Sequence, residues 1–355
     1  MEKRKLGYIE SRAVHIFEKR QQTGTIVTSA NIEGEVDEDT MIDALEAMFE
    51  RHPLAQSVII KEDGDYFFEQ SAQFDDIYIE FSDNKKSVFN QDFTREMSAV
   101  IDQERALWRC TILLDHTKRK KKHHTLILTT HPSISDGIST AMFVHDLMTI
   151  YEKLQENSEY QPDSLPFIDP VEELANSNKS VDEFHRETEE VRSFRGNGLP
   201  FTKDVAGDKR QTRGRYIDFS EEEVEAIHRA SREHKVSVNA TLNAAMLLAY
   251  ADIYKKPVKV ATRTPVNMRK HSIPEIGREF FGLFISLVES LFDVSPNGEG
   301  IFDLARHYQE ELDRTMSSEI YMPNKIGMST SELFDKLGDC IGASEGEFSS
   351  ALSLA

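Results

Sequence analysis

The chain passes from a β pattern, through a polar turn of seven residues, directly into a helical pattern. Residues 125–130 form an apolar, β-prone run, and the turn 131–137 follows with the sequence HPSISDG. Apolar residues then recur at helical spacing over 142–154. A strand, a tight polar turn and a helix meet here. We therefore expect a mixed α/β layer structure.

The rest of the first half also alternates helix and strand patterns. Asp37 is a suitable N-cap for an amphipathic helix over 37–51, which Pro53 would end. We expect a hairpin of 107–114 with 125–130, whose tip over 118–122 is basic; the tip is either a solvated loop, which the residues favour, or an anion-attracting site. Further strands are predicted at 56–61, 66–68 and 77–81.

The second half repeats this alternation after a polar, glycine-containing stretch. Ser220 and Glu223 form a capping-box pattern that opens a helix. A second helix is expected around 242–249, and a strand over 258–264 leads to Arg269. We predict an N-terminal domain over 1–175, a crossover over 176–214 and a C-terminal domain over 215–355.

Composition excludes several classes of protein. The 42 Lys and Arg against 62 Asp and Glu give a net charge of −20, which disfavours nucleic acid and anionic membranes. Cys110 and Cys340 are isolated, so neither a disulfide scaffold nor a zinc site is predicted. The N-terminus lacks the apolar core of a signal peptide, and the apolar run 244–251 is too short for a membrane span. We expect a cytoplasmic protein.

The turn 131–137 is the main candidate site. A histidine that leaves a strand can act as a general base, and Asp136 with Gly137 supplies a carboxylate and a sharp turn. The alternative is structural: Asp136 caps the following helix and His131 bonds locally. The residues alone favour this structural alternative.

Other candidates are weaker. Ser133 and Ser135 lack the G-x-S-x-G elbow of a nucleophilic serine. His52 fits a helix end, and His145 fits an ordinary histidine of a helix. The glycines form neither a dinucleotide fingerprint nor a P-loop, and we predict no metal site.

The turn also resembles the HHxxxDG signature of the chloramphenicol acetyltransferase superfamily, which includes alcohol acetyltransferases, plant HxxxD acyltransferases and condensation domains of nonribosomal peptide synthetases. Similar stretches follow in the order of that superfamily and cover nearly the whole chain, at 4–10, 32–54, 107–109, 219–242 and 265–269. The resemblance implies two mixed-sheet domains with a channel between them and the turn near its middle.

One residue departs from the signature. In the superfamily the second histidine deprotonates the acceptor, and Pro132 stands at that position, while His131 stands at the first. Shifting one position along a strand points a side chain to the opposite face. Either the turn is re-formed so that His131 serves as base, or the usual base is gone. The resemblance also implies that Asp136 pairs with an arginine of the second domain, which Arg269 matches.

The implied activity is transfer of an acyl group from a thioester of coenzyme A or a carrier protein to a hydroxyl or amine. The thioester would be a co-substrate, with no permanently bound cofactor. A catalytically inactive member that binds an acyl ligand, a carrier or another protein is the alternative, and a plain interaction domain is a third. The superfamily usually continues into a DFGWG-like motif that this sequence lacks, so a shortened second domain is expected.

Overall fold

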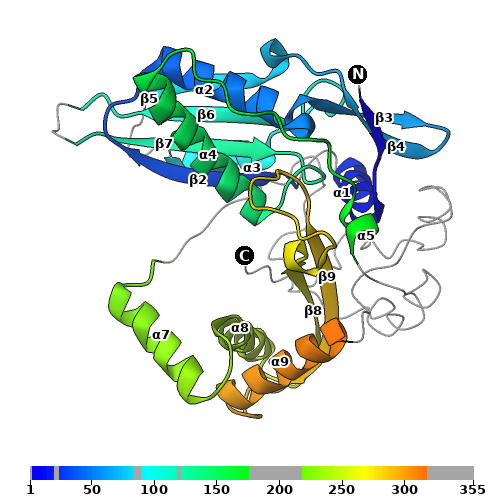
Figure 1. The fold of residues 1–355 in the computed structure, drawn as a ribbon. Helices are drawn as coiled ribbons and strands as arrows, with labels where there is room; N and C mark the ends of the chain where they lie inside the picture. The colour runs from blue at the N-terminus through cyan, green and yellow to red at the C-terminus, as the bar shows by residue number, and fades with distance from the viewer. Residues whose placement is uncertain (1, 20–23, 84–88, 118–120, 176–217, 318–355) are drawn as a thin grey trace.

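The computed structural model describes residues 2–19, 24–83, 89–117, 121–175 and 218–317. The described residues form mixed α/β structure with three separate sheets (Figure 1). This confirms the predicted fold class. The first two sheets belong to the N-terminal half, and the third, of two strands, belongs to the second half.

A four-stranded sheet forms the centre of the N-terminal half. Its strands lie in the order β2-β7-β6-β5, and β5 pairs parallel with β6 while the other pairs are antiparallel. The β6–β7 pair is the predicted hairpin, in which Trp108 lies opposite Thr130. The strands are β2 (Ile26–Glu33), β5 (Tyr78–Asp83), β6 (Trp108–Leu114) and β7 (His123–Thr130).

Two helices, α2 (Glu38–Arg51) and α4 (Gly137–Glu156), contact each other and share one hydrophobic core with this sheet. Asp37 caps α2 as predicted, because its side chain accepts the Thr40 N–H at 2.9 Å. The predicted apolar face is buried except for Ile42, which is 37% exposed. The apolar residues that recur at helical spacing therefore face the core.

A smaller sheet lies beside the first. Its order is β1-β4-β3, with β1 (Lys3–Lys5), β3 (Ser57–Glu62) and β4 (Asp65–Gln70). The N-terminal helix α1 (Tyr8–Lys19) packs Val14 into the core, and α3 (Phe89–Ser98) contacts β2 and β7. Short 3-10 turns occur at Pro53–Gln56 and Phe74–Asp76.

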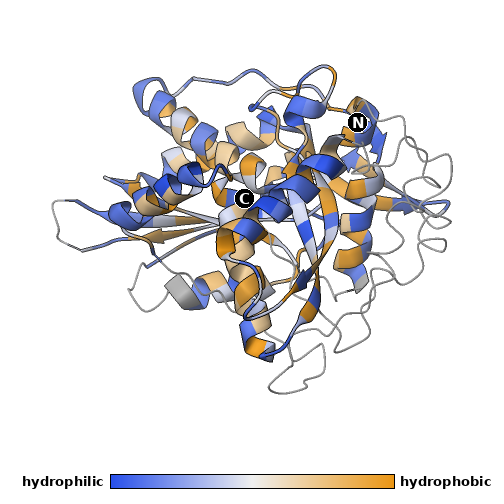
Figure 2. Ribbon diagram, turned by 90° about the horizontal axis from the view of Figure 1, so that it is seen from below, coloured by the Kyte–Doolittle hydropathy of each residue, from blue (hydrophilic) through white to orange (hydrophobic). Residues whose placement is uncertain are grey.

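The second half contains α7 (Glu221–Glu233), α8 (Val238–Tyr254), β8 (Val258–Asn267), a 3-10 turn Arg269–His271, β9 (Ile285–Val294) and α9 (Ile301–Ser317). The predicted capping box is present, since Ser220 and Glu223 bond reciprocally. α8 and α9 share a core with the β8–β9 ribbon. Figure 2 shows hydrophobic and hydrophilic residues interspersed along these helices and strands.

The short helix α5 (Val171–Leu174) stands at the end of the first half. The predicted crossover 176–214, Cys340 and the C-terminal stretch 318–355 lie outside the described residues, so the domain boundaries stay predictions. Among the described helices, none is by itself long and apolar enough to cross a bilayer. The bent pair α7 and α8, at 99°, meets the length and composition criteria only when taken together.

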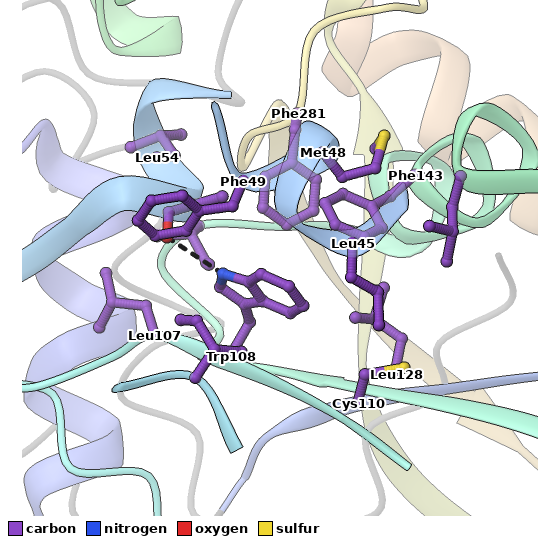
Figure 3. Close-up of a cluster of buried hydrophobic side chains, with 14 of the residues drawn as sticks. Leu45, Met48, Phe49, Leu54, Leu107, Trp108, Cys110, Leu128, Phe143 and Phe281 are labelled. Carbon is purple, nitrogen blue, oxygen red and sulfur yellow. Dashed lines mark hydrogen bonds between the residues drawn. The ribbon is translucent and has the colours of Figure 1, made fainter. Parts of the chain in front are cut away.

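A phenylalanine of the second half completes the core of the first. Phe281 is 6% exposed and lies among Phe49, Met48 and Phe143 (Figure 3). Its ring centroid is 5.1 Å from that of Phe143. Below it, the Trp108 indole N–H donates to the Ala55 carbonyl at 3.0 Å. The two halves are therefore joined by an inserted aromatic ring.

We predict that Phe281→Ala lowers the free energy of unfolding by about 3–5 kcal/mol, because it leaves a cavity in the core of the first half. Urea denaturation measures this loss. As a control, Ile253→Ala on α8 removes a side chain that is 58% exposed and should change stability by no more than about 0.5 kcal/mol. Equal losses in the two variants would show that Phe281 is not an anchor.

Candidate functional site

The turn 131–137 connects the end of β7 to the start of α4, as the sequence indicates. Asp136 is the N-cap of α4, and its side chain accepts the Ser139 N–H at 2.8 Å. The His131 carbonyl accepts the Ile134 N–H at 3.2 Å, which closes the turn. Within the turn, only Pro132 and Gly137 reach the surface, the former partly.

His131 is fully buried. Its ring meets the edge of Phe17 on α1 at a centroid distance of 4.3 Å, and its backbone N–H donates to Leu107. The ring Nδ1 accepts the Ser133 N–H at 3.2 Å, so the neutral ring carries its proton on Nε2, which has no hydrogen-bond partner among the described residues. Burial lowers the pKa of His131 to about 3. In this conformation the imidazole is not accessible from the surface.

The two serines of the turn are also inaccessible. The Ser133 hydroxyl lies 2.7 Å from His131 Nδ1, and the Ser135 hydroxyl lies 2.6 Å from that of Thr130. Both serines have no exposed surface. Each hydroxyl satisfies a buried polar neighbour, which agrees with the low weight that the sequence gives them as nucleophiles.

Asp136 and Arg269 form the ion pair that the resemblance implies. The guanidinium donates to the Asp136 carboxylate at 3.1 and 3.3 Å, and both side chains are at most 4% exposed. Arg269 also stacks over the ring of Phe284 at 4.7 Å. A backbone group of the second half also contacts this carboxylate, because the Phe284 N–H donates to it at 2.9 Å.

Ser139 completes this network, and sequence reasoning missed it. Its hydroxyl accepts from Arg269 at 2.6 Å and from the Gly282 N–H at 3.2 Å, and it donates to the Gly282 carbonyl. We call the set Asp136, Ser139, Arg269, Gly282 and Phe284 the clasp. The backbone groups of Gly282 and Phe284 leave no signature in a single sequence. The Ser139 hydroxyl could have been found, because it lies in the first turn after the N-cap Asp136.

His52 lies next to the clasp. It follows α2 as its C-cap, which agrees with the prediction of a helix end. Its ring centroid is 5.7 Å from that of Phe143 and 5.8 Å from that of Phe281, and together with Pro53 and Phe167 it lines a small hollow between the halves. Burial lowers the pKa of His52 to about 3. His145, on the outer side of α4, is exposed.

The remaining candidates supply no chemistry. At the hairpin, Lys121 and Lys122 pair with Glu33 and Glu35, so their charges are compensated, while 118–120 lie outside the described residues. Within the described ranges no cluster of three metal-ligating side chains occurs. Cys110 is buried, and burial raises the pKa of its thiol.

The exposed side of the turn therefore offers no titratable group. Pro132, which the resemblance aligns with the usual base, cannot accept a proton, and Gly137 has no side chain. What the turn does offer is a fixed backbone held by the clasp at the junction of the two halves. The interdomain channel itself stays a prediction.

Comparison with known proteins places these features in a family. The family model for the condensation domain matches residues 13–326. The chain is similar in structure to polyketide synthase associated protein 5 from Mycobacterium tuberculosis, with a TM-score of 0.65 and 19% identity over 99% of this chain and 80% of that one. No curated protein sequence matches the chain.

Two further solved structures show the same fold. The first condensation domain of the calcium-dependent antibiotic synthetase gives a TM-score of 0.65 at 15% identity, over 99% of this chain and 81% of that one. The epimerization domain of the third module of tyrocidine synthetase B gives 0.63 at 17% identity, over 90% and 76%. At these identities the likeness establishes the fold.

We predict that Arg269→Ala lowers the free energy of unfolding by about 3–5 kcal/mol, because it leaves the buried Asp136 carboxylate unpaired. A double-mutant cycle with Asp136→Ala should give a coupling energy of about 0.5–3 kcal/mol. Arg306→Ala, which removes an exposed pair with Asp303, is the control and should cost at most about 1 kcal/mol. Simple additivity in the cycle would contradict the clasp.

A second prediction concerns the protonation of His131. Its pKa lies below that of an unfolded histidine, so its contribution to stability is present above about pH 6.5 and is lost as the pH falls toward 3. Nitrogen-15 NMR of the imidazole should therefore show a neutral ring with the proton on Nε2 until the protein unfolds in acid. Titration of His131 near pH 6.5 in the folded protein would show that the ring is accessible after all.

Proposed function

The chain belongs to the condensation domain family, and from this premise we propose that it transfers an acyl group from a thioester to an amine at the turn 131–137. The thioester is carried by coenzyme A or by a carrier protein. The amine is chosen over a hydroxyl for a reason that lies in the turn itself, given below.

The clasp is the observation that supports this proposal. A buried arginine and aspartate are costly to keep unless they are paired and hydrogen-bonded, and here both conditions are met across the two halves. The contacts hold the turn at the junction between the halves, where the family's reaction would take place. The described residues thus retain the framework of the site.

The missing base decides the class of acceptor. A neutral amine attacks the thioester carbonyl with its own lone pair, the carbon–sulfur bond breaks, and the thiolate leaves. The proton released from the nitrogen goes to the thiolate or to water, so the products are an amide and a free thiol. A hydroxyl keeps its proton at neutral pH and depends on a base, which typically contributes about 10²- to 10⁴-fold. Pro132 supplies none, which favours amines.

A second candidate function is a binder that does not turn over. Pro132 is the observation that favours it, because loss of a general base lowers a rate without removing the surfaces that bind a thioester. On this alternative the chain holds an acyl ligand or carrier at the same junction.

We predict that Pro132→His raises acyl transfer to alcohols by about 10²- to 10⁴-fold and gives the rate an acid limb near pH 6.5. Transfer to amines by the wild type should instead follow only the fraction of neutral amine. Release of free thiol from a series of acyl-CoAs, with paired amines and alcohols of equal size, measures both. Ile138→His is the matched control, since it adds an imidazole at an exposed position just beyond the turn and should leave alcohols unreactive.

The other outcomes separate the alternatives. Loss of amine transfer in a folded His131→Ala variant would identify His131 as a base that becomes uncovered during the reaction. Thermal stabilisation by acyl-CoA without thiol release in the wild type would support the binder. Neither stabilisation nor release, with coenzyme A or carrier thioesters, would leave a plain interaction domain and contradict the proposal.

A further inference from the structure

A glutamate on α5 lies buried against the N-terminal helix. Glu172 is 5% exposed, and its Oε1 accepts the backbone N–H of Ile9 in the first turn of α1. Its Oε2 has no hydrogen-bond partner among the described residues. The side chain thus fastens α5 to α1 through one oxygen and leaves the other unsatisfied, which is costly for an ionised carboxylate.

The same short helix also holds the second half of the chain. Val171 packs in one cluster with Met268 and Phe284. The Leu174 carbonyl accepts the Ile273 N–H at 2.8 Å, and Ala175 forms a β-bridge with Ser272. Because these contacts lie within a few residues of Arg269, α5 links α1 to the segment that carries the clasp.

The charged groups around Glu172 do not neutralise it. Glu10 on α1 acts on it as a like charge, and Arg4 on β1 is committed to Glu10 through contacts of 2.7 and 2.9 Å. On α5 itself, Glu173 is exposed. In the segment packed on the other side, Arg269 is committed to Asp136, while Lys270 and His271 are exposed. Burial, and next Glu10, raises the pKa of Glu172 to about 7.

The backbone leaves Glu172 little room to adjust. A Cβ at Gly7 would collide with Glu172 Oε2 and with Pro170 Cβ, so the glycine permits a very close approach. An ionised Oε2 could gain a hydration shell on this side only if α5 moved away from α1. Ionisation and undocking of α5 are therefore coupled.

We propose that Glu172 is a proton-controlled latch, which when protonated docks α5 on α1 and when ionised releases α5 together with the second-half segment 268–273. The latch does not rest on the acyl-transfer proposal, but the segment 268–273 contains Arg269, so its release would also act on the clasp. It gives the junction between the halves a dependence on pH in the neutral range.

Hydrogen exchange of the full chain tests the latch. The sign follows from the raised pKa of Glu172 in the docked state. Between about pH 4.5 and 7 the docked state holds the proton and the undocked state has lost it. Docking therefore weakens as the pH rises through this window and levels off above it. After correction for the chemical exchange rate, protection of the Ile9 and Ile273 amides should fall by about tenfold per pH unit between pH 5 and 7. Glu172→Gln should keep both amides protected at every pH.

Two controls make the outcome decisive. Glu173→Gln changes the exposed neighbour and should behave as the wild type. Glu10→Gln frees Arg4 to act on Glu172 and should move the response to lower pH, which keeps the test open if Glu172→Gln fails to fold. A response at Ile9 without one at Ile273 would overturn the latch, since Glu172 would then be an isolated buried acid. The same wild-type pH dependence in Glu172→Gln would overturn it as well.

Discussion

The structure depends on one carboxylate. Asp136 caps α4, pairs with Arg269 and accepts the backbone N–H of Phe284, so a single side chain fixes the start of a helix and joins the two halves. A carboxylate has about four lone-pair sites, and these donors use them. Because removing one donor leaves a buried charge partly unsatisfied, the contacts stabilise one another rather than acting separately. These contacts also hold the turn that precedes Asp136 in place.

Sequence patterns predicted the elements whose period is carried by apolar residues, and they missed elements whose inward side chains are polar. On β9 the inward positions include Ser286 and Ser290, while Leu287 and Leu291 stand on the other face, so the hydrophobic alternation is blurred. In α1 the buried positions include Glu10, whose charge is paired with Arg4 of the preceding strand β1. Hydrophobic periodicity does not report a pairing between charged side chains of this kind.

The candidate site divides in the same way. The resemblance placed Asp136 with Arg269, and the structure brings them together. The resemblance did not decide which way His131 points. Both faces of β7 are covered, so the alternation of residues along the strand does not indicate which side chains are exposed. The ring contacts Phe17, which lies on a helix that the sequence did not reveal. The orientation of His131 is therefore a matter of packing with residues outside the turn.

The buried titratable groups oppose one another in their dependence on pH. His131 and His52, both with pKa values lowered by burial, contribute stability that is lost as the pH falls below about 6.5. Glu172, with its pKa raised, contributes stability that is lost as the pH rises from about 4.5 toward 7. Between about pH 4.5 and 6.5 the unfolded state binds two histidine protons that the folded state lacks, whereas the folded state holds one glutamate proton that the unfolded state lacks. The effect of the two histidines is larger, so the combined contribution of these three groups is greatest near pH 6.5. The packing that buries His131 thus makes the fold sensitive to acid, and the contact that joins α5 to α1 makes it sensitive to base.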